Sequence, residues 1–174
     1  MDATTSAPIA APGSPPGKMT PRDARLRPAA PADLPAVERL LAESGLPLDG
    51  VREALPTFVV AESADALVGV AGLEVRGDDD LLRSVAVAPA WRAHGVGRAL
   101  VMRLIADAEA RGLRALYLLT TTAERYFPSF GFEVLSRDDV PAAVRATVEF
   151  TSACPASATV MVRQCDCPSA PAHT

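Results

Sequence analysis

Apolar and polar positions repeat along the chain with two periods, which predicts a single α/β domain. Strand-type patterns cover residues 24–27, 58–62, 67–75, 81–88, 113–120, 132–135 and 157–162. Helical spacing covers residues 33–44 and 98–111, with shorter helices at 50–55, 123–129 and 140–150. Because strands alternate with helices, we expect a mixed sheet flanked by helices.

The clearest unit is a strand at 81–88, a helix at 98–111 and a strand at 113–120. Such a unit predicts a right-handed crossover and two parallel strands. The strand at 67–75 precedes it, and the polar residues 76–80 between the two strands predict a hairpin.

The ends of the chain differ in composition from its centre. Residues 1–22 and 165–174 are polar or rich in Pro and Ala, so we expect a disordered leader and a disordered tail. Residues 23–164 then form the folded domain. Translation from Met1 or from Met19 is equally compatible with this division.

Composition narrows the class of protein. The chain of 174 residues is 49% hydrophobic and 22% charged, with a net charge of -4. This charge gives no overall attraction to nucleic acid or to an anionic membrane. No secretory signal or membrane-spanning run is present, so we expect a cytoplasmic protein. Three cysteines form neither a disulfide framework nor a metal site by spacing, and no metal is expected.

The most informative segment joins the strand at 81–88 to the long helix. It reads Arg92-Ala93-His94-Gly95-Val96-Gly97. A helix start offers unpaired N–H groups and a positive dipole, and glycine lets an anion approach the backbone. We therefore expect a diphosphate cradle with added charge from Arg92 and Arg98, although an ordinary strand-to-helix connection fits the glycines equally well. A Walker loop is excluded because the only lysine is Lys18.

This segment resembles the [RQ]-x-x-G-x-[GA] signature of the GNAT acetyltransferase superfamily. A block ending in Phe130-Gly131-Phe132 resembles the second motif of that superfamily, and the likeness covers residues 24–163. The resemblance implies a mostly antiparallel sheet around the parallel unit, with acetyl-CoA as acetyl donor. The implied acetyl-CoA contacts are Val85, Ala86, Val87, Arg92, Ala93, His94, Gly95, Val96, Gly97, Arg98, Thr120 and Phe127.

Three positions depart from the common pattern of the superfamily. Phe127 stands where many members carry a tyrosine acid, and Tyr126 beside it is expected to point elsewhere. Thr120 replaces an asparagine, and Leu81 replaces a glutamate base. The α-amino group of a peptide has a pKa of about 7.7–8.0, against about 10.4 for a lysine amine, so such an amine needs less help from a base. The absences thus favour an amino-acid-like acceptor.

Several segments resemble the amino-acid N-acetyltransferases, and more closely the arsenic-resistance N-acetyltransferase subfamily. They are residues 118–123, 127–132, 69–75, 81–84, 140–147 and 154–158. The resemblance implies an amino acid as acceptor, including organoarsenical analogues, and pairing of two copies as a homodimer. A non-catalytic acyl-CoA sensor and a protein N-acetyltransferase remain alternatives.

Two charges interrupt apolar strands. A hairpin centred between Asp78 and Asp79 would place Glu74 directly opposite Arg83. One interpretation is a structural ion pair. The other makes Arg83 a bidentate clamp for a substrate carboxylate and Glu74 a water-relayed base or amine anchor. We expect the acidic run 78–80 to be a solvated turn.

Further candidates have weaker support. Arg125 and Arg145 are reserve carboxylate ligands on helix faces, and Glu124 is a weaker candidate base. Cys154 is expected to be a small buried residue, so direct transfer is favoured over an acetyl-cysteine step. Trp91 is expected to pack over the turn.

Overall fold

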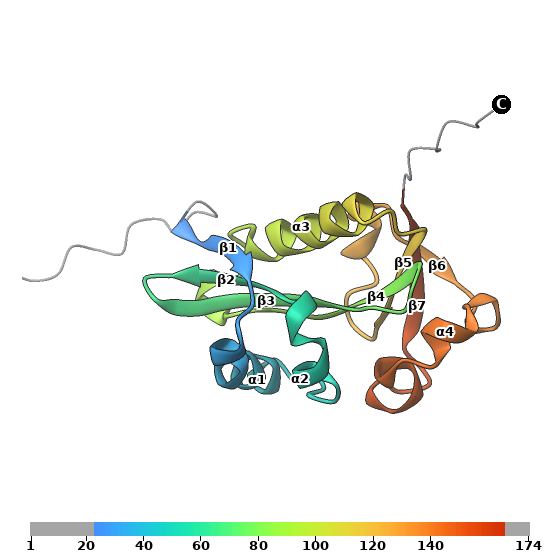
Figure 1. Cartoon of the computed structure of the whole chain (residues 1–174), viewed down its shortest axis with the longest axis horizontal. Helices are drawn as coiled ribbons and strands as arrows, with labels where there is room; N and C mark the ends of the chain where they lie inside the picture. The colour runs from blue at the N-terminus through green and yellow to red at the C-terminus, as the bar shows by residue number, and fades with distance from the viewer. Residues whose placement is uncertain (1–22, 166–174) are drawn as a thin grey trace, which may run out of the picture.

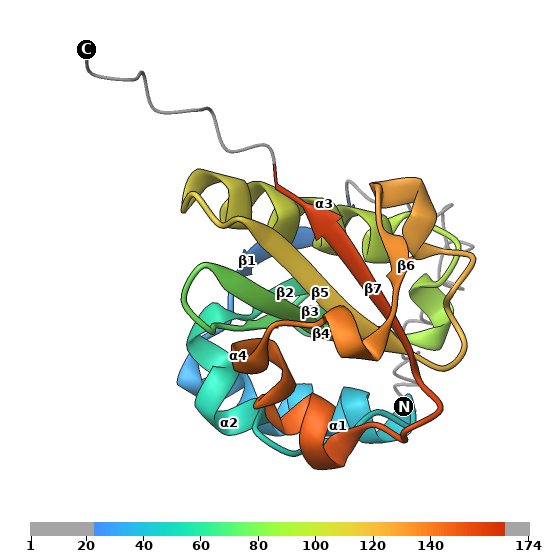
Figure 2. The same ribbon diagram turned by 90° about the vertical axis from the view of Figure 1, so that its right-hand side faces the viewer.

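A computed structural model describes residues 23–165 of the chain. The predicted leader and residues 166–174 of the predicted tail lie outside this range. Seven strands form one sheet in the order β1-β2-β3-β4-β5-β7-β6 (Figures 1 and 2). The strands are β1 (Arg25–Pro28), β2 (Val59–Ser63), β3 (Ala66–Glu74), β4 (Asp79–Val87), β5 (Ala115–Thr120), β6 (Glu133–Leu135) and β7 (Thr159–Gln164).

Helices cover both faces of this sheet. Helix α3 (Val96–Ala110) lies on one face, and α1 (Leu34–Glu43), α2 (Val51–Ala54) and α4 (Ala142–Arg145) lie on the other (Figure 1). Only the β4–β5 pair is parallel, and every other neighbouring pair of described strands is antiparallel. The predicted fold class is thereby confirmed. No helix within residues 23–165 is long and apolar enough to cross a bilayer.

The apolar stripe of α3 forms the centre of the larger core. The five residues of the predicted stripe are buried against β3 and β4, and they are Leu100, Val101, Leu104, Ile105 and Ala108. The helix begins at Val96, two residues before the predicted start, because Gly95 adopts a left-handed conformation (φ +82°) as its N-cap. The cradle and the helix are therefore continuous.

Two predicted helices take other forms. The segment 123–129 contains a turn followed by a 3₁₀ helix at Phe127–Phe130. The segment 140–150 is split into α4 and a π helix at Glu149–Ala153. The hydroxyl of the buried Thr147 donates to the carbonyl oxygen of Val144 (2.7 Å), so it bonds the backbone locally where the two parts meet.

The hairpin register differs from the prediction. Glu74 pairs with Leu81 and Gly72 pairs with Arg83, so the turn is centred one residue earlier than predicted. Gly77 supplies the positive φ (+85°) that this turn requires. Glu74 and Arg83 are therefore diagonal neighbours on one face of the sheet, and the predicted direct opposition is wrong.

The acidic run at the start of β4 is also not the solvated turn that we expected. Asp79 and Asp80 are 4% and 0% exposed. Asp79 pairs with Arg114 (2.5 Å), and Asp80 pairs with Arg111 (2.7 Å). These arginines come from the end of α3 and the residues before β5, so the carboxylates join the hairpin to the crossover.

The chain at the end of β7 is ordered one residue further than predicted. Cys165, expected to begin the tail, is buried in the α3 core. Its backbone N–H donates to the carbonyl oxygen of Arg114 (3.0 Å). The last strand thus continues the contact between β7 and β5.

Two irregularities open the sheet beside β4. The pairing of β3 with β4 shifts between Gly72–Arg83 and Val70–Ala86, which places one extra residue in β4. Within that bulge Ser84 has a positive φ (+58°), which is rare for a residue with a side chain. The parallel pairing of β4 with β5 ends at Leu81 and Tyr117, just before this bulge. The two strands diverge from there.

Candidate active site

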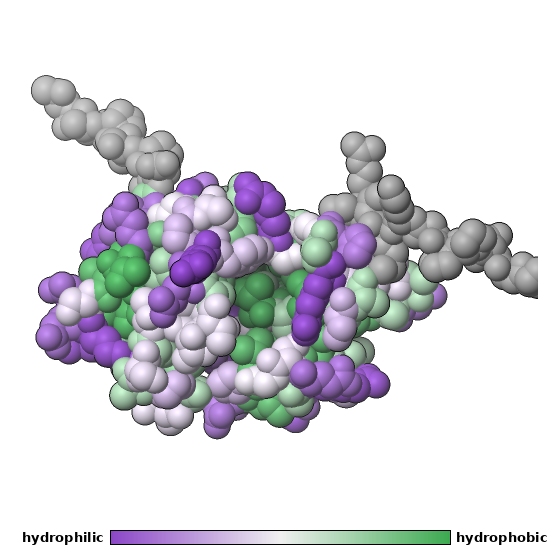
Figure 3. All heavy atoms as spheres, turned by 180° about the vertical axis from the view of Figure 1, so that it is seen from behind, coloured by the Kyte–Doolittle hydropathy of each residue, from purple (hydrophilic) through white to green (hydrophobic). Residues whose placement is uncertain are grey.

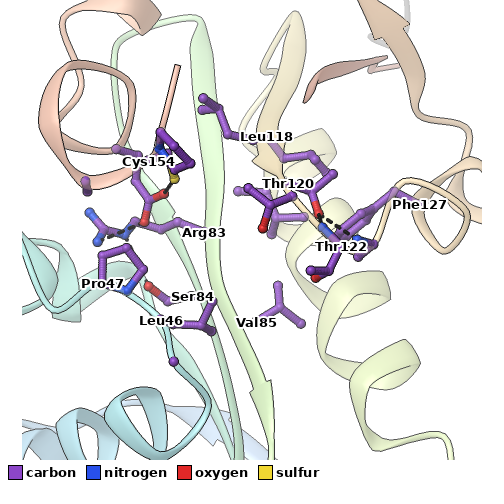
Figure 4. A pocket seen from close by; sticks show the side chains of 18 of the residues that line it. Leu46, Pro47, Arg83, Ser84, Val85, Leu118, Thr120, Thr122, Phe127 and Cys154 are labelled. Atoms are coloured by element: carbon purple, nitrogen blue, oxygen red, sulfur yellow. Dashed lines mark hydrogen bonds and ion pairs between the residues drawn. The ribbon is translucent and has the colours of Figure 1, made fainter. Parts of the chain in front are cut away.

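A cavity of about 350 Å³ lies where β4 and β5 diverge. Side chains from both strands border it, with Ser84 and Val85 on β4 and Leu118 and Thr120 on β5 (Figure 4). Residues 45–47, which follow α1, and residues 153–155, at the end of the π helix, close its other sides. The face turned away from the viewer in Figure 1 has an apolar recess with hydrophilic side chains on either side (Figure 3).

The predicted cradle lies at the start of α3, next to the end of β4. Ala93 and Gly95 both have positive φ values (+61° and +82°), which turn the chain sharply into the helix. Arg92 Nε donates to the carbonyl oxygen of Val87 (3.0 Å), and His94 Nδ1 lies 2.6 Å from the carbonyl oxygen of Arg92. The first turn of α3 leaves backbone N–H groups without helical partners, which suits a phosphate.

Tyr126 lies between the cradle and the cavity. This residue borders the cavity, and a Cβ atom added to Gly97 would lie 3.3 Å from its hydroxyl oxygen. The prediction that Tyr126 points elsewhere is wrong, because residues 123–126 form a turn and not a helix. Burial raises the pKa of Tyr126 above its ordinary value, against an opposing effect of Arg98, so the hydroxyl is protonated at neutral pH.

Phe127 and Thr120, two positions that depart from the superfamily pattern, both border the cavity. Phe127 is buried, borders the cavity and packs edge-on against Phe132 (5.8 Å between centroids). The hydroxyl of Thr120 accepts from the backbone N–H of Ala123 (2.9 Å). Arg98 stacks over the Phe130 ring, with Cζ 5.2 Å from the centroid. These contacts fix the turn that carries Tyr126.

Arg83 is the cation in the wall of the cavity. Its side chain is fully buried and bonds to four other residues. Nη1 donates to Glu74 (3.1 Å), Nη2 donates to the carbonyl oxygen of Asp49 (2.5 Å) and pairs with Glu149 (3.1 Å), and Nε donates to Ser84 (3.2 Å). One guanidinium therefore ties β3, the loop after α1 and the π helix to the bulge in β4.

Glu74 lies on the other side of Arg83 from the cavity. It pairs with Arg76 as well as Arg83, and its Oε1 lies 3.3 Å from the backbone nitrogen of Val148. It borders a separate cavity of about 490 Å³, together with Gly50 and Arg76. The structure brings Arg83 to the candidate site and places Glu74 behind it.

The structure brings to the cavity a carboxylate that was not among the candidates predicted from sequence. Glu149 is 6% exposed, and it borders the cavity beside Arg83 and Cys154. Cys154 Sγ donates to Glu149 Oε2 (2.9 Å). The predicted helix at 140–150 gave no reason to turn Glu149 toward the strands, because its position depends on the π helix. Its spacing of five residues from Cys154 was the available signal.

The weaker candidates lie away from this cavity. Glu124 Oε1 accepts from the hydroxyl of Thr159 (2.5 Å), and both Glu124 and Arg125 border a shallower surface cavity over the turn at 121–126. Arg145 is exposed on α4. Trp91 packs against the α3 core.

Comparisons with known proteins agree with this arrangement. The acetyltransferase (GNAT) domain family matches residues 55–134. An amino-acid acetyltransferase of Mycobacterium tuberculosis is 36% identical over 138 residues, which cover 71% of this chain and 78% of that protein. The chain spans 18% to 29% of the length of the longer curated relatives that it matches.

Solved structures of acetyltransferases also superpose on this chain. N-acetylglutamate synthase from Neisseria gonorrhoeae, complexed with coenzyme A and N-acetyl-glutamate, superposes with a TM-score of 0.70 at 25% identity, over 81% of this chain and 35% of that one. Rv2747 from Mycobacterium tuberculosis, solved in complex with CoA, superposes with a TM-score of 0.69 at 27% identity, over 80% and 98%. Sequence and structure together place this chain in the GNAT acetyltransferase family.

Proposed function

We propose that the protein transfers an acetyl group from acetyl-CoA to the α-amine of an amino acid. The observation that carries this proposal is the continuity between the helix start at 92–98 and the cavity where β4 and β5 diverge. An elongated molecule with a diphosphate at one end and a thioester at the other fits such a path. The names of the matched relatives favour an amino acid as acceptor.

The residues present fit the acetyl-donor substrate. The turn at 92–98 offers backbone N–H groups and the exposed side chains of Arg92 and Arg98 to a diphosphate. Residues 85–87, at the end of the bulge and beyond it, offer a strand without a partner on the β5 side to the pantetheine arm. Gly97 leaves room near Val87 that a larger side chain would fill. Acetyl-CoA supplies an activated thioester carbonyl at the cavity.

The acceptor end of the cavity pairs opposite charges. The side chains of Arg83 and Glu149 lie 3.1 Å apart in its wall, and Leu46 and Pro47 close it with apolar surface. An amino acid carries both an ammonium and a carboxylate, so a wall with both charges suits it better than it suits a simple amine. A volume of about 350 Å³ matches a small acceptor.

Arg83 acts chiefly as a positioning residue in this proposal. The bidentate clamp on a substrate carboxylate stays a prediction, and it would require Arg83 to release some of its four protein partners. Its positive charge still favours a carboxylate nearby. Glu74 balances that charge from behind and stays only a predicted base.

The test is release of coenzyme A, followed with a thiol reagent. Purified protein receives acetyl-CoA with single α-amino acids, with phosphinic and arsinic glutamate analogues, or with lysine-type amines. We expect release with one or more α-amino acids. Acetyl-CoA binding without release on any amine would instead establish the acyl-CoA sensor, and preference for a peptide amine would establish protein acetylation.

Three finer features remain predictions from sequence alone. They are the organoarsenical acceptor, the homodimer and the cytoplasmic location. Product analysis with the arsinic analogue and sedimentation of the purified protein test the first two directly.

A further inference from the structure

We infer that Glu149 is the residue that receives the acceptor ammonium and takes its proton. This inference rests on the proposed acetyl transfer and deepens it, because neither base candidate from the sequence borders the acceptor cavity. Glu74 lies behind Arg83, and Glu124 lies over the turn outside the cavity.

Glu149 is the only carboxylate among the described residues that border this cavity, and histidine and lysine are absent from the same set. The thiol of Cys154 is no alternative base. Burial, with a contribution from Glu149, raises its pKa to about 12, so it is protonated and acts as a donor at neutral pH. Among the described residues that border the cavity, Glu149 is therefore the carboxylate that can accept the proton of the ammonium.

The contacts of Glu149 leave it able to bind an ammonium. Oε1 pairs with Arg83 Nη2 (3.1 Å), and Oε2 accepts from Cys154 Sγ (2.9 Å). A carboxylate offers about four acceptor sites, so two remain after these contacts. Because both oxygen atoms are held by fixed partners, the carboxylate is oriented before the acceptor arrives, which lowers the cost of ordering it.

The π helix explains how these groups meet. The backbone N–H of Cys154 donates to the carbonyl oxygen of Glu149 (3.0 Å), a bond across five residues. In this π turn the side chains of Glu149 and Cys154, five residues apart, lie on the same side. In an α-helix the residues that share a side are three or four apart. Such π turns occur often at functional sites.

The acceptor nitrogen loses two protons during the proposed transfer. The acceptor ammonium gives one proton to Glu149, and the neutral nitrogen forms a bond to the acetyl carbon. The bond from that carbon to sulfur breaks, and its electron pair leaves with the sulfur of coenzyme A. The second nitrogen proton passes through solvent to that sulfur, and Glu149 releases its proton to water. The net products are the N-acetyl amino acid, coenzyme A and one proton.

The experiment compares Glu149→Gln with the matched control Glu133→Gln, which changes an exposed glutamate on the edge strand β6. We expect kcat/KM to fall by about 10² to 10⁴-fold in Glu149→Gln and to remain unchanged in the control. Acetyl-CoA binding, measured by calorimetry, should stay within threefold of the wild type, whereas calorimetric binding of the amino acid should weaken.

A second readout separates proton transfer from structural damage. Without the carboxylate, only acceptor that is already neutral reacts, so the activity of Glu149→Gln should rise with pH up to the amine pKa. The defect should be smaller for acceptors with a lower amine pKa. Glu149→Asp, which retains the charge, should recover part of the rate at neutral pH.

The outcomes are distinct. No release of coenzyme A by the wild type with any amine would overturn the proposed function itself. An active wild type with an equally active Glu149→Gln would overturn only the role of Glu149. A uniform loss across acceptors and pH, with weakened acetyl-CoA binding, would also overturn it in favour of a structural role.

Discussion

Cys154 and Glu149 are joined by a thiol-to-carboxylate hydrogen bond of 2.9 Å at the wall of the candidate active site. The thiol is the donor, because burial and the neighbouring carboxylate raise the pKa of Cys154 to about 12. The same contact fixes one oxygen of Glu149. Cys154 therefore orients the carboxylate of Glu149 and is a poor nucleophile at neutral pH.

Cys154 should resist alkylation in the folded protein. At pH 8 we expect iodoacetamide to leave Cys154 unmodified over times that modify an ordinary exposed thiol, because only the thiolate reacts. Peptide mapping by mass spectrometry distinguishes it from the other cysteines. Since the folded pKa is raised, this thiol favours the fold below its unfolded pKa of about 8.5 and loses that effect as the pH rises toward 12.

Fast alkylation of Cys154 at pH 8 would contradict this assignment and revive the acetyl-cysteine alternative. The variant Glu149→Gln supplies the control. It removes a charge that raises the pKa, so alkylation above pH 9 should be faster in this variant than in the wild type.

Arg83→Met should be strongly destabilising. It leaves Glu74 and Glu149 buried with a lost partner, and breaking a buried pair typically costs about 3–5 kcal/mol. Urea unfolding measures the change, with Arg145→Met on the exposed face of α4 as control. The double variant Arg83→Met/Glu149→Gln should be more stable than Arg83→Met alone. If the free energy of unfolding of Arg83→Met were close to that of the wild type, the ion pairs of Arg83 with Glu74 and Glu149 would not stabilise the fold.

Gly97→Val should weaken acetyl-CoA binding. The new side chain would occupy the space beside Val87 and the hydroxyl of Tyr126, on the path proposed for the donor. We expect Kd to rise at least tenfold, which corresponds to about 1.4 kcal/mol. Calorimetry measures it, and Met102→Val, at an exposed position of the same helix, controls for the β-branched residue. Equal affinities in both variants would place the donor elsewhere.

Asp80→Ala should destabilise the fold, whereas Asp78→Ala should not. Asp80 is fully buried, pairs with Arg111 and accepts from the backbone N–H of Arg76, while Asp78 is exposed. Loss of such buried bonds costs about 1–3 kcal/mol. Thermal or urea unfolding of the two variants decides the matter, and similar small effects in both would mean that the hairpin is solvated after all.

Acid should weaken the contact of Asp33 with Arg27. The hydrogen bond from Arg27 lowers the pKa of Asp33, so this carboxylate stabilises the fold above its unfolded pKa of about 3.9. The stabilisation is lost as the pH falls through the lower folded value. Asp33→Asn should therefore flatten the dependence of unfolding free energy on pH below about 4. An unchanged slope in this variant would argue against the contact.

The elements with strong periodicity were predicted well from sequence. The stripe on α3 follows the helical repeat, and the turn from Arg92 to Gly97 combines glycine with a helix start, so both could be placed without tertiary information. The hairpin register could not be predicted in the same way, because Asp79 and Asp80 appear as turn residues until their arginine partners are known. Those partners lie 31 and 35 residues away in sequence.

The acceptor side of the site was predicted least well. Glu149 reaches the cavity through a π helix, which no simple repeat marks, and Tyr126 reaches it through a turn that apolar spacing had suggested was a helix. Arg83 was found because a charge within an apolar strand is conspicuous. Whether Arg83 clamps a substrate or holds the fold together depends on its contacts with three other segments. Those contacts are visible only in the folded chain.

The short pairing of β4 with β5 has a consequence for the durability of the protein. Strand pairing between β4 and β5 comprises three residue pairs along this seam, and α3 covers them from one side. A donor bound along the seam would bridge both halves and make tolerance to heat and protease depend on its supply. Each tenfold rise in free acetyl-CoA above its Kd would then add about 1.4 kcal/mol to the free energy of unfolding. Protein without bound acetyl-CoA would then unfold and be cleaved by protease more readily than protein saturated with it.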